Sequence, residues 1–339
     1  MNGHLTELLT VLALVSPAAA SQDLFSDPVA RVLKVKGMVR IQDQEGENRV
    51  ADVYGIVREN EQLIVKADAE ITLGFRLDGH MERLKGSYQA KVTTNKVVAP
   101  AAKVERIAPP RKHRRLVAGA VKKLKPLNRE GTRLLRGPDG TASAHEETPA
   151  SGELNPINKS TILSLRPMLT WPPVAGAVAY DVILSHPNGL PIWTATTTQT
   201  SLECTGVRQL HSGNAYGWEV TARLGDQDSR RAYRGEFLVA TDEQRNEESQ
   251  VEELITDSKT VYLVLAASWY ESNGFLAEAI AVCRRVIKLE PTSASAHRAL
   301  ATLYDRAGRR QDAKNAWMQA NRILSRQREP ARVRSIFAD

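Results

Sequence analysis

Residues 266–274 read AASWYESNG, and 34 positions further on residues 300–308 read LATLYDRAG. An alanine, a tyrosine and a glycine keep their places in both stretches, and a second alanine follows at the same spacing. A fixed period of this length is typical of stacked helical hairpins, each of which buries its apolar face against the next. Small alanines let paired helices approach while the tyrosines fill the space beside them, so these positions indicate core packing. The matched pairs are Ala267 and Ala301, Tyr270 and Tyr304, Gly274 and Gly308, and Ala279 and Ala313.

The repeated pattern resembles the tetratricopeptide repeat. Leu263 stands with the alanines on the expected first helix, Gly274 marks the turn, and Leu-Glu-Pro at 289–291 closes the second helix. The resemblance implies two repeats over residues 260–327. An acidic lead-in helix at 241–258 and a tail at 328–339 are expected to cover the two ends.

In that family the first helix of each repeat lines a groove that binds a protein or peptide. The resemblance therefore implies a partner-binding groove in this chain. Two arginines in it suit an acidic peptide or a C-terminal carboxylate, because each guanidinium can hold a carboxylate bidentately. The expected exposed groove positions are Val264, Ser268, Glu271 and Ser272 in the first repeat and Arg298, Thr302, Asp305 and Arg306 in the second.

Residues 30–98 follow a different period. Apolar residues alternate with polar ones in short runs, and glycine or aspartate turns separate the runs, which predicts a small all-β domain. The stretch resembles the FecR-like domain of bacterial envelope proteins, which implies that fold and an extracytoplasmic setting. The segments that carry the resemblance are Lys36-Gly37, Asn60-Glu61-Gln62-Leu63, Ala69-Glu70-Ile71-Thr72-Leu73 and Leu77-Asp78-Gly79.

Residues 161–240 form a second β region, with short strands at turn-bounded spacing that predict a sandwich. The run Leu169-Thr170-Trp171-Pro172-Pro173-Val174 and the later Tyr216-Gly217-Trp218 resemble a fibronectin type III or related immunoglobulin-like domain. In that family the early Trp and the late Tyr are core residues, so Trp171 and Tyr216 are expected to pack. Trp193 and Trp218 leave a sugar-binding surface open as the alternative to buried indoles.

Net charge is concentrated in one segment of the 339-residue chain. The chain carries +7, but residues 103–136 hold 12 Lys and Arg against 2 Glu, so the remainder is −3. Prolines interrupt residues 99–160, which we interpret as a basic linker. No aromatic residue is interleaved with the basic runs, which argues against nucleic acid. An anionic cell-envelope polymer or membrane surface is the more accessible partner, and a solvated tether is the other interpretation.

The first residues predict export. An apolar run at 8–15 precedes Ala18-Ala19-Ala20-Ser21, small residues of the kind that signal peptidase requires, so residues 1–21 are interpreted as a signal peptide. No later stretch approaches 18 uninterrupted apolar residues, so no transmembrane span is expected. The predicted location is the periplasm or cell envelope.

No catalytic, cofactor or metal motif is found in the sequence. The seven histidines are scattered, and the two cysteines lie in unlike segments, which excludes a disulfide framework and a four-ligand zinc site. The expected architecture is β then α: a FecR-like domain, a fibronectin type III-like sandwich and C-terminal tetratricopeptide repeats. We predict a non-enzymatic exported scaffold that binds a protein or peptide through the repeats. The alternative is a cell-wall or glycan-binding protein that uses the β domains and the basic linker.

Overall fold

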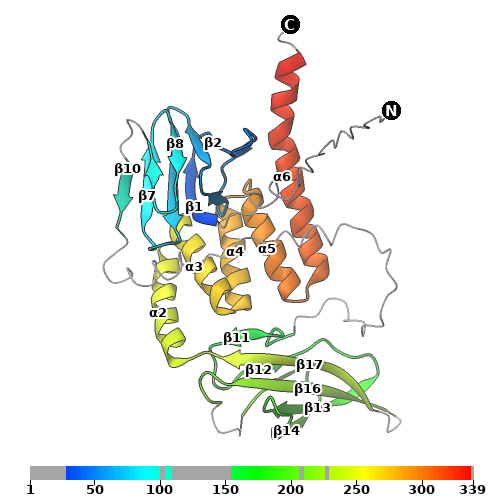
Figure 1. Ribbon diagram of the computed structural model, residues 1–339. Helices are drawn as coiled ribbons and strands as arrows, with labels where there is room; N and C mark the ends of the chain where they lie inside the picture. Colours follow the sequence, from blue (N-terminus) through cyan, green and yellow to red (C-terminus); the bar gives the residue numbers. More distant parts are fainter. Residues whose placement is uncertain (1–27, 100–103, 109–153, 206–209, 226–228, 337–339) are drawn as a thin grey trace, which may run out of the picture.

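The computed structural model describes residues 28–99, 104–108, 154–205, 210–225 and 229–336, and the side chains of the last helix up to residue 327. Two β units are followed by a helical region, so the predicted fold class of β then α is confirmed. The helical region lies between the two β units (Figure 1). The predicted signal peptide at 1–21 and most of the predicted linker at 99–160 lie outside the described residues.

Residues 28–108 make the N-terminal β unit, which consists of two five-stranded sheets with the orders β10-β7-β6-β1-β4 and β3-β2-β5-β8-β9. Alternating apolar side chains from both sheets meet in one core cluster, which includes Ile41, Leu63 and Leu73. The strands are β1 Pro28–Lys36, β2 Val39–Gln42, β3 Asn48–Val50, β4 Ile56–Arg58, β5 Gln62–Val65, β6 Glu70–Phe75, β7 Met81–Lys85, β8 Tyr88–Val92, β9 Val97–Val98 and β10 Val104–Ile107.

The N-terminal β unit extends beyond its expected end at residue 98. Strand β10 pairs antiparallel with β7, from Val104 opposite Leu84 to Ile107 opposite Met81. The sequence prediction missed this edge strand because residues 104–107 lie at the start of the basic segment, where charge hides the alternation. The sandwich in turn begins before residue 161, since Asn155 bridges to Thr170.

Residues 154–240 make the β-sandwich unit. A five-stranded sheet of order β11-β17-β16-β13-β14 faces the two-stranded sheet β12-β15. Trp171 and Tyr216 lie in its core, and the Tyr216 hydroxyl accepts a hydrogen bond from the His211 backbone N–H at 2.9 Å. The strands are β11 Ser160–Ile162, β12 Met168–Thr170, β13 Ala177–Ser185, β14 Pro191–Thr197, β15 Ser201–Glu203, β16 Ala215–Leu224 and β17 Ser229–Val239.

The helical region consists of α2 Asp242–Thr256, α3 Thr260–Asn273, α4 Leu276–Leu289, α5 Ala294–Arg306 and α6 Arg310–Ile336. Helices α3 and α4 form the first hairpin, and α5 and α6 form the second. The two hairpins start 34 residues apart, at Thr260 and Ala294. Each has a left-handed glycine at its turn, Gly274 with φ 82° and Gly308 with φ 74°, a conformation that glycine adopts without a Cβ clash. Helix α6 extends far past α5 (Figure 1).

Helix α2 begins with a capping box and is held to α3 by two of its carboxylates. Thr241 and Gln244 cap the first turn reciprocally. The Trp269 indole N–H donates to Glu247 at 3.0 Å, and the Tyr270 hydroxyl donates to Glu248 at 2.9 Å. Burial raises the pKa of the Glu248 carboxyl, and burial together with Glu248 raises that of Glu278. Two acidic residues of the lead-in helix therefore accept hydrogen bonds from aromatic side chains of α3. No helix among the described residues is long and apolar enough to cross a membrane.

Candidate functional site: the inner face of the helical hairpins

The eight expected groove positions lie on α3 and α5, but those of α3 are not open to solvent. Val264 is 0 % exposed, Ser268 is 1 % exposed and Glu271 is 9 % exposed, while Ser272 is partly buried. The N-terminal β unit covers this face, because Leu33, Val53 and Tyr54 share one apolar cluster with Val264 and its neighbours. The expectation that these positions are exposed therefore differs from the structure, in which the chain itself covers them. Partner binding at these residues stays a prediction.

Strand β1 brings a buried arginine to α3. Arg31 is 1 % exposed, and its Nη1 donates a hydrogen bond to the Ser268 hydroxyl at 3.3 Å. The guanidinium carbon lies 4.5 Å from the centroid of the Tyr54 ring, within the range of a cation–π contact. Burial, followed by the nearby Glu271 charge, raises the pKa of the Tyr54 hydroxyl well above its ordinary value. Arg31 is thus a positive charge enclosed between a sheet and a helix.

Residues 51–55 form the loop between β3 and β4, which we call the clasp. It contacts α5 at its first turn. The Asp52 carboxylate accepts hydrogen bonds from the backbone N–H and the hydroxyl of Ser295, both at 2.6 Å. The Ser293 hydroxyl caps α5 by accepting from the Ala296 N–H at 3.0 Å and donates to the Val53 carbonyl at 2.6 Å. The clasp therefore supplies a carboxylate to a helix N-terminus 243 residues away in the chain, where the helix dipole favours negative charge.

The clasp has an unusual backbone. Tyr54 has φ 74°, a left-handed conformation that is uncommon for a bulky residue, although its side chain is fully buried. At the next position, a Cβ added to Gly55 would lie 2.8 Å from the Asp52 carbonyl and 2.9 Å from its carboxylate. Glycine is therefore required at 55 for Asp52 to reach α5. Desolvation raises the pKa of the Asp52 carboxyl, against the lowering effect of the Ser295 and Ser293 donors and of Arg298.

The groove positions of α5 are more open than those of α3. Asp305 and Arg306 are exposed, and Arg298 and Thr302 are partly buried. The guanidinium of Arg298 lies 5.2 Å from the Trp317 ring centroid, and Arg306 lies 4.0 Å from the Glu271 carboxylate. The structure thus brings Arg306 and Glu271 together across the two hairpins.

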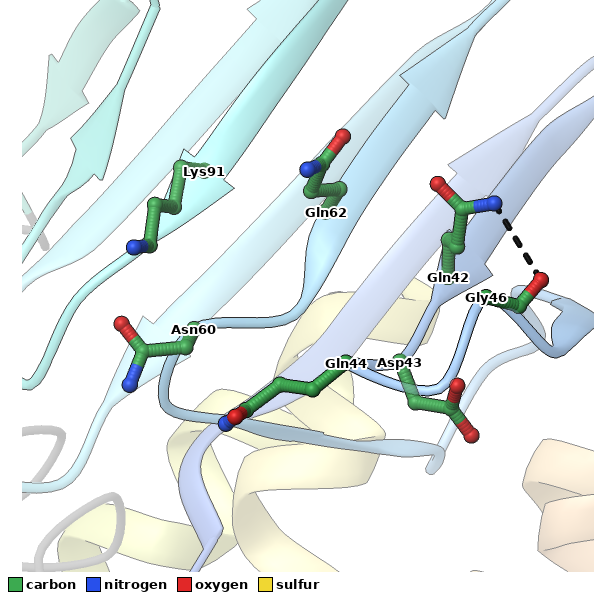
Figure 2. A pocket seen from close by; sticks show the side chains of 7 residues that line it. All are labelled: Gln42, Asp43, Gln44, Gly46, Asn60, Gln62 and Lys91. Carbon is green, nitrogen blue, oxygen red and sulfur yellow. Dashed lines mark hydrogen bonds between the residues drawn. The ribbon is translucent and has the colours of Figure 1, made fainter.

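A separate polar depression of about 520 Å³ lies on the outer face of the N-terminal β unit. Gln42, Gln62 and Lys91 are cross-strand neighbours on β2, β5 and β8, and Figure 2 shows their side chains in one row. The Asp43 carboxylate is held by the N–H groups of Glu45 and Glu47 in the adjoining turn. The depression is lined by Gln42, Asp43, Gln44, Gly46, Asn60, Gln62 and Lys91.

The candidate sugar-binding tryptophans do not form a common surface. Trp218 is 2 % exposed and belongs to the sandwich core. Trp193 is partly buried, and its indole N–H donates to the Thr205 carbonyl at 3.1 Å. Within the described part of the chain, no group of three or more His, Cys, Asp or Glu side chains is placed to hold a metal ion.

Sequence reasoning missed the residues that close the inner face: Arg31, Asp52, Tyr54, Ser293 and Ser295. One signal was present in the sequence, since residues 261–267 of α3 read VYLVLAA, an apolar run with no polar side of the helix, and the structure buries nine consecutive residues from Leu263 to Glu271. A helix that is apolar on every side is covered on every side. Nothing in the spacing of the sequence names the covering segment.

Comparisons with known proteins give structural neighbours only. No protein-family model and no curated protein matches the sequence. Among solved structures, CopC from Methylosinus trichosporium OB3b is similar over 27 % of this chain and 92 % of its own, with 15 % identity and a TM-score of 0.21. The FN1–FN3 domains of chicken CNTN1 are similar over 64 % of each chain, with 10 % identity and a TM-score of 0.20. This chain therefore spans less than two thirds of that second structure, and these TM-scores carry no argument about function.

Proposed function

We propose that the chain is a non-enzymatic, exported scaffold that binds a protein or peptide partner through the inner face of its helical hairpins. One observation carries the proposal: this face already makes a protein contact, because the N-terminal β unit buries Val264, Ser268 and Glu271. The β unit contributes a carboxylate, Asp52, to the N-terminus of α5 and a buried arginine, Arg31, to Ser268 on α3. Polar contacts of this kind around an apolar centre are typical of protein–protein recognition.

Several features support a tetratricopeptide-like identity for the hairpins. The 34-residue offset of both helix pairs and the left-handed glycines at both turns are what that resemblance implies. The sheet order of the sandwich supports the fibronectin type III-like identity in the same way. The FecR-like identity and the envelope location rest on the sequence resemblance and the predicted signal peptide.

The second hairpin offers the more accessible part of the face to an external partner. Asp305 and Arg306 are exposed at the end of α5, and Thr302 is partly buried one turn before them. Arg306 pairs with Glu271 only at 4.0 Å, so a partner carboxylate can compete for it. An acidic peptide segment is the partner chemistry that this end of the groove favours.

Site-specific photo-cross-linking in the native envelope tests this function. A photo-reactive amino acid in place of Thr302 is expected to give a discrete cross-linked protein, and one in place of the exposed Lys288 on α4 is not. Arg306→Glu should abolish the product, whereas the charge-matched Lys314→Glu on the exposed side of α6 should leave it unchanged. Equal cross-linking from positions 302 and 288 would reject the groove.

The polar depression favours glycan binding as a second candidate function. Carboxamides both donate and accept hydrogen bonds, which suits sugar hydroxyls, and three of the lining side chains form a cross-strand row. Soluble cell-wall oligosaccharides titrated into the full chain should shift NMR signals of Gln42 and Gln62 side-chain amides. Gln62→Ala should remove the shifts and Gln89→Ala, on the same sheet outside the depression, should retain them. No shift at millimolar glycan would reject this candidate.

A further inference from the structure

The N-terminal β unit does not need the helices to complete its own core. Its two sheets enclose an apolar cluster, with Val39, Ile71 and Phe75 among its members, that contains no residue of the helical region. Among the described residues of this unit, the side chains that join the apolar cluster of the helices are Leu33, Val53, Tyr54 and Met81, together with the partly buried Ile107. The β unit is therefore a module with its own core that docks onto the hairpins.

The docking contact carries features that an obligate core avoids. Arg31 is buried at 1 % exposure, and burial raises the pKa of the Asp52 carboxyl, so two charged groups are removed from water at this contact. Tyr54 holds a left-handed backbone, which costs free energy and persists only where the surroundings impose it. These costs offset part of the stabilisation from the apolar contacts.

The same contact supplies hydrogen-bond partners to polar groups on α3 and α5. The first turn of α5 has its Ser295 N–H and hydroxyl bonded to Asp52, and Ser268 on α3 accepts from Arg31. Val264, at the centre of the covered face, has no exposure. Whatever replaces the β unit must therefore bring a carboxylate to α5 and an apolar side chain to α3.

We propose that the N-terminal β unit is an internal competitor: it docks reversibly on the inner face of the hairpins, with the clasp on α5 and Arg31 on α3, and a partner binds the covered part of that face only when the clasp opens. The inference rests on the proposed function of this face in partner binding. The occupant that displaces the clasp is a protein segment with an acidic residue next to a large apolar one, the chemistry of Asp52-Val53-Tyr54. Because the β unit is part of the same chain, redocking is intramolecular, at an effective concentration on the order of mM.

Thiol labelling of the full chain tests the opening without any partner. Ser268→Cys places a reporter thiol under the clasp, while the native Cys204 and Cys283 are buried in the sandwich and between the helices. Burial raises the pKa of the Cys204 thiol to about 12, so this thiol should react slowly with the reagent and serve as the reference for the labelling rate. With iodoacetamide in excess, the thiol at position 268 should react faster than both native thiols.

Asp52→Ala in this background should speed labelling at position 268 by about 10-fold or more, because both charge-assisted bonds to Ser295 are lost. Asp181→Ala is the matched control, since its carboxylate also accepts a hydroxyl hydrogen bond, from Thr196, and a second one from Arg223, but within the sheet of the sandwich. Labelling at position 268 that stays as slow as at Cys204 in the Asp52→Ala chain would overturn the proposal.

Cross-linking from position 302 tests the competition. If the β unit is a competitor, Asp52→Ala should raise the yield of the cross-linked partner and Asp181→Ala should not. Faster labelling with an unchanged cross-linking yield would overturn the competition. Absence of any cross-linked product from position 302 in every variant would instead reject the proposed function, while labelling still reports whether the clasp opens.

Discussion

The helical region contacts its two β units in opposite ways. The sandwich is joined to it by hydrogen bonds to main-chain carbonyls: the Thr161 N–H donates to the Gly274 carbonyl at 2.8 Å and the Thr161 hydroxyl donates to the Asn273 carbonyl at 2.8 Å. The chain also runs directly from β17 through Ala240 into the capped start of α2. The N-terminal β unit is held instead by the side chains of Arg31, Asp52 and Tyr54. We therefore expect single side-chain substitutions to open the clasp more readily than the sandwich junction.

The largest effect is expected from Ala279→Arg, which should break both contacts together. Ala279 is fully buried between the paired helices, so a long charged side chain there combines overpacking with a buried charge. The helical circular-dichroism signal should melt at a much lower temperature, with a loss of about 4 kcal/mol or more in the free energy of unfolding. Ala277→Arg, two positions away and exposed, should melt like the native chain. Equal melting of the two variants would show that the hairpin register is wrong.

Tyr54→Ala should open the clasp and leave the sandwich junction intact. Removing a fully buried aromatic side chain costs about 3–5 kcal/mol, here taken from the docking contact. Hydrogen exchange of the α3 amides should accelerate, while exchange in the strands β13 and β16 stays at the native rate. Acceleration in both regions would mean that the two contacts open as one unit.

Gly274→Ala should lower the free energy of unfolding more than Gly308→Ala does, because it also disturbs the sandwich junction at Thr161. Both positions have positive φ, so each alanine costs about 1 kcal/mol of backbone strain. At Gly274 the new Cβ would also lie 2.7 Å from the Thr161 hydroxyl, whereas at Gly308 nothing lies within 4 Å. The expected difference in unfolding free energy is about 1 kcal/mol, from the displaced hydrogen bond. Equal losses would argue that Thr161 does not lock the turn.

The smallest effect is a pH dependence of the helical region. Burial holds the pKa values of Glu248 and Glu278 above the ordinary 4.5, so folding favours their protonated forms. The resulting penalty is complete above these raised pKa values and disappears as the pH falls towards 4.5. These two groups should therefore raise the melting temperature of the helical region on acidification across that window, and Glu248→Gln should flatten the rise. A native-like slope in Glu248→Gln would remove Glu248 as its source.

The sequence was informative where a signal is local. The 34-residue spacing predicted the hairpins and their glycine turns, and the runs around Trp171 and Tyr216 predicted strands with those residues in a core. It failed at contacts between distant segments. Asp52 and Ser295 are 243 residues apart, and neither belongs to a spacing pattern. Arg31 is a charged residue on β1, and nothing in the sequence shows that it is buried. The groove positions of α3 were expected to be exposed because the family resemblance places them there, and the sequence does not show that a distant segment covers them.

A double-mutant cycle between Asp52→Ala and Ser295→Ala tests most directly the central claim that the N-terminal β unit covers the inner face of the hairpins. The Ser295 hydroxyl donates to the Asp52 carboxylate at 2.6 Å, and Ser295→Ala removes this bond while the backbone N–H of residue 295 can still donate to Asp52. The free energy of opening the helical region, measured by hydrogen exchange at α5, should show a coupling of about 1.5 kcal/mol or more between the two substitutions. Effects that add to within about 0.3 kcal/mol would contradict the account, because residues that do not touch are independent.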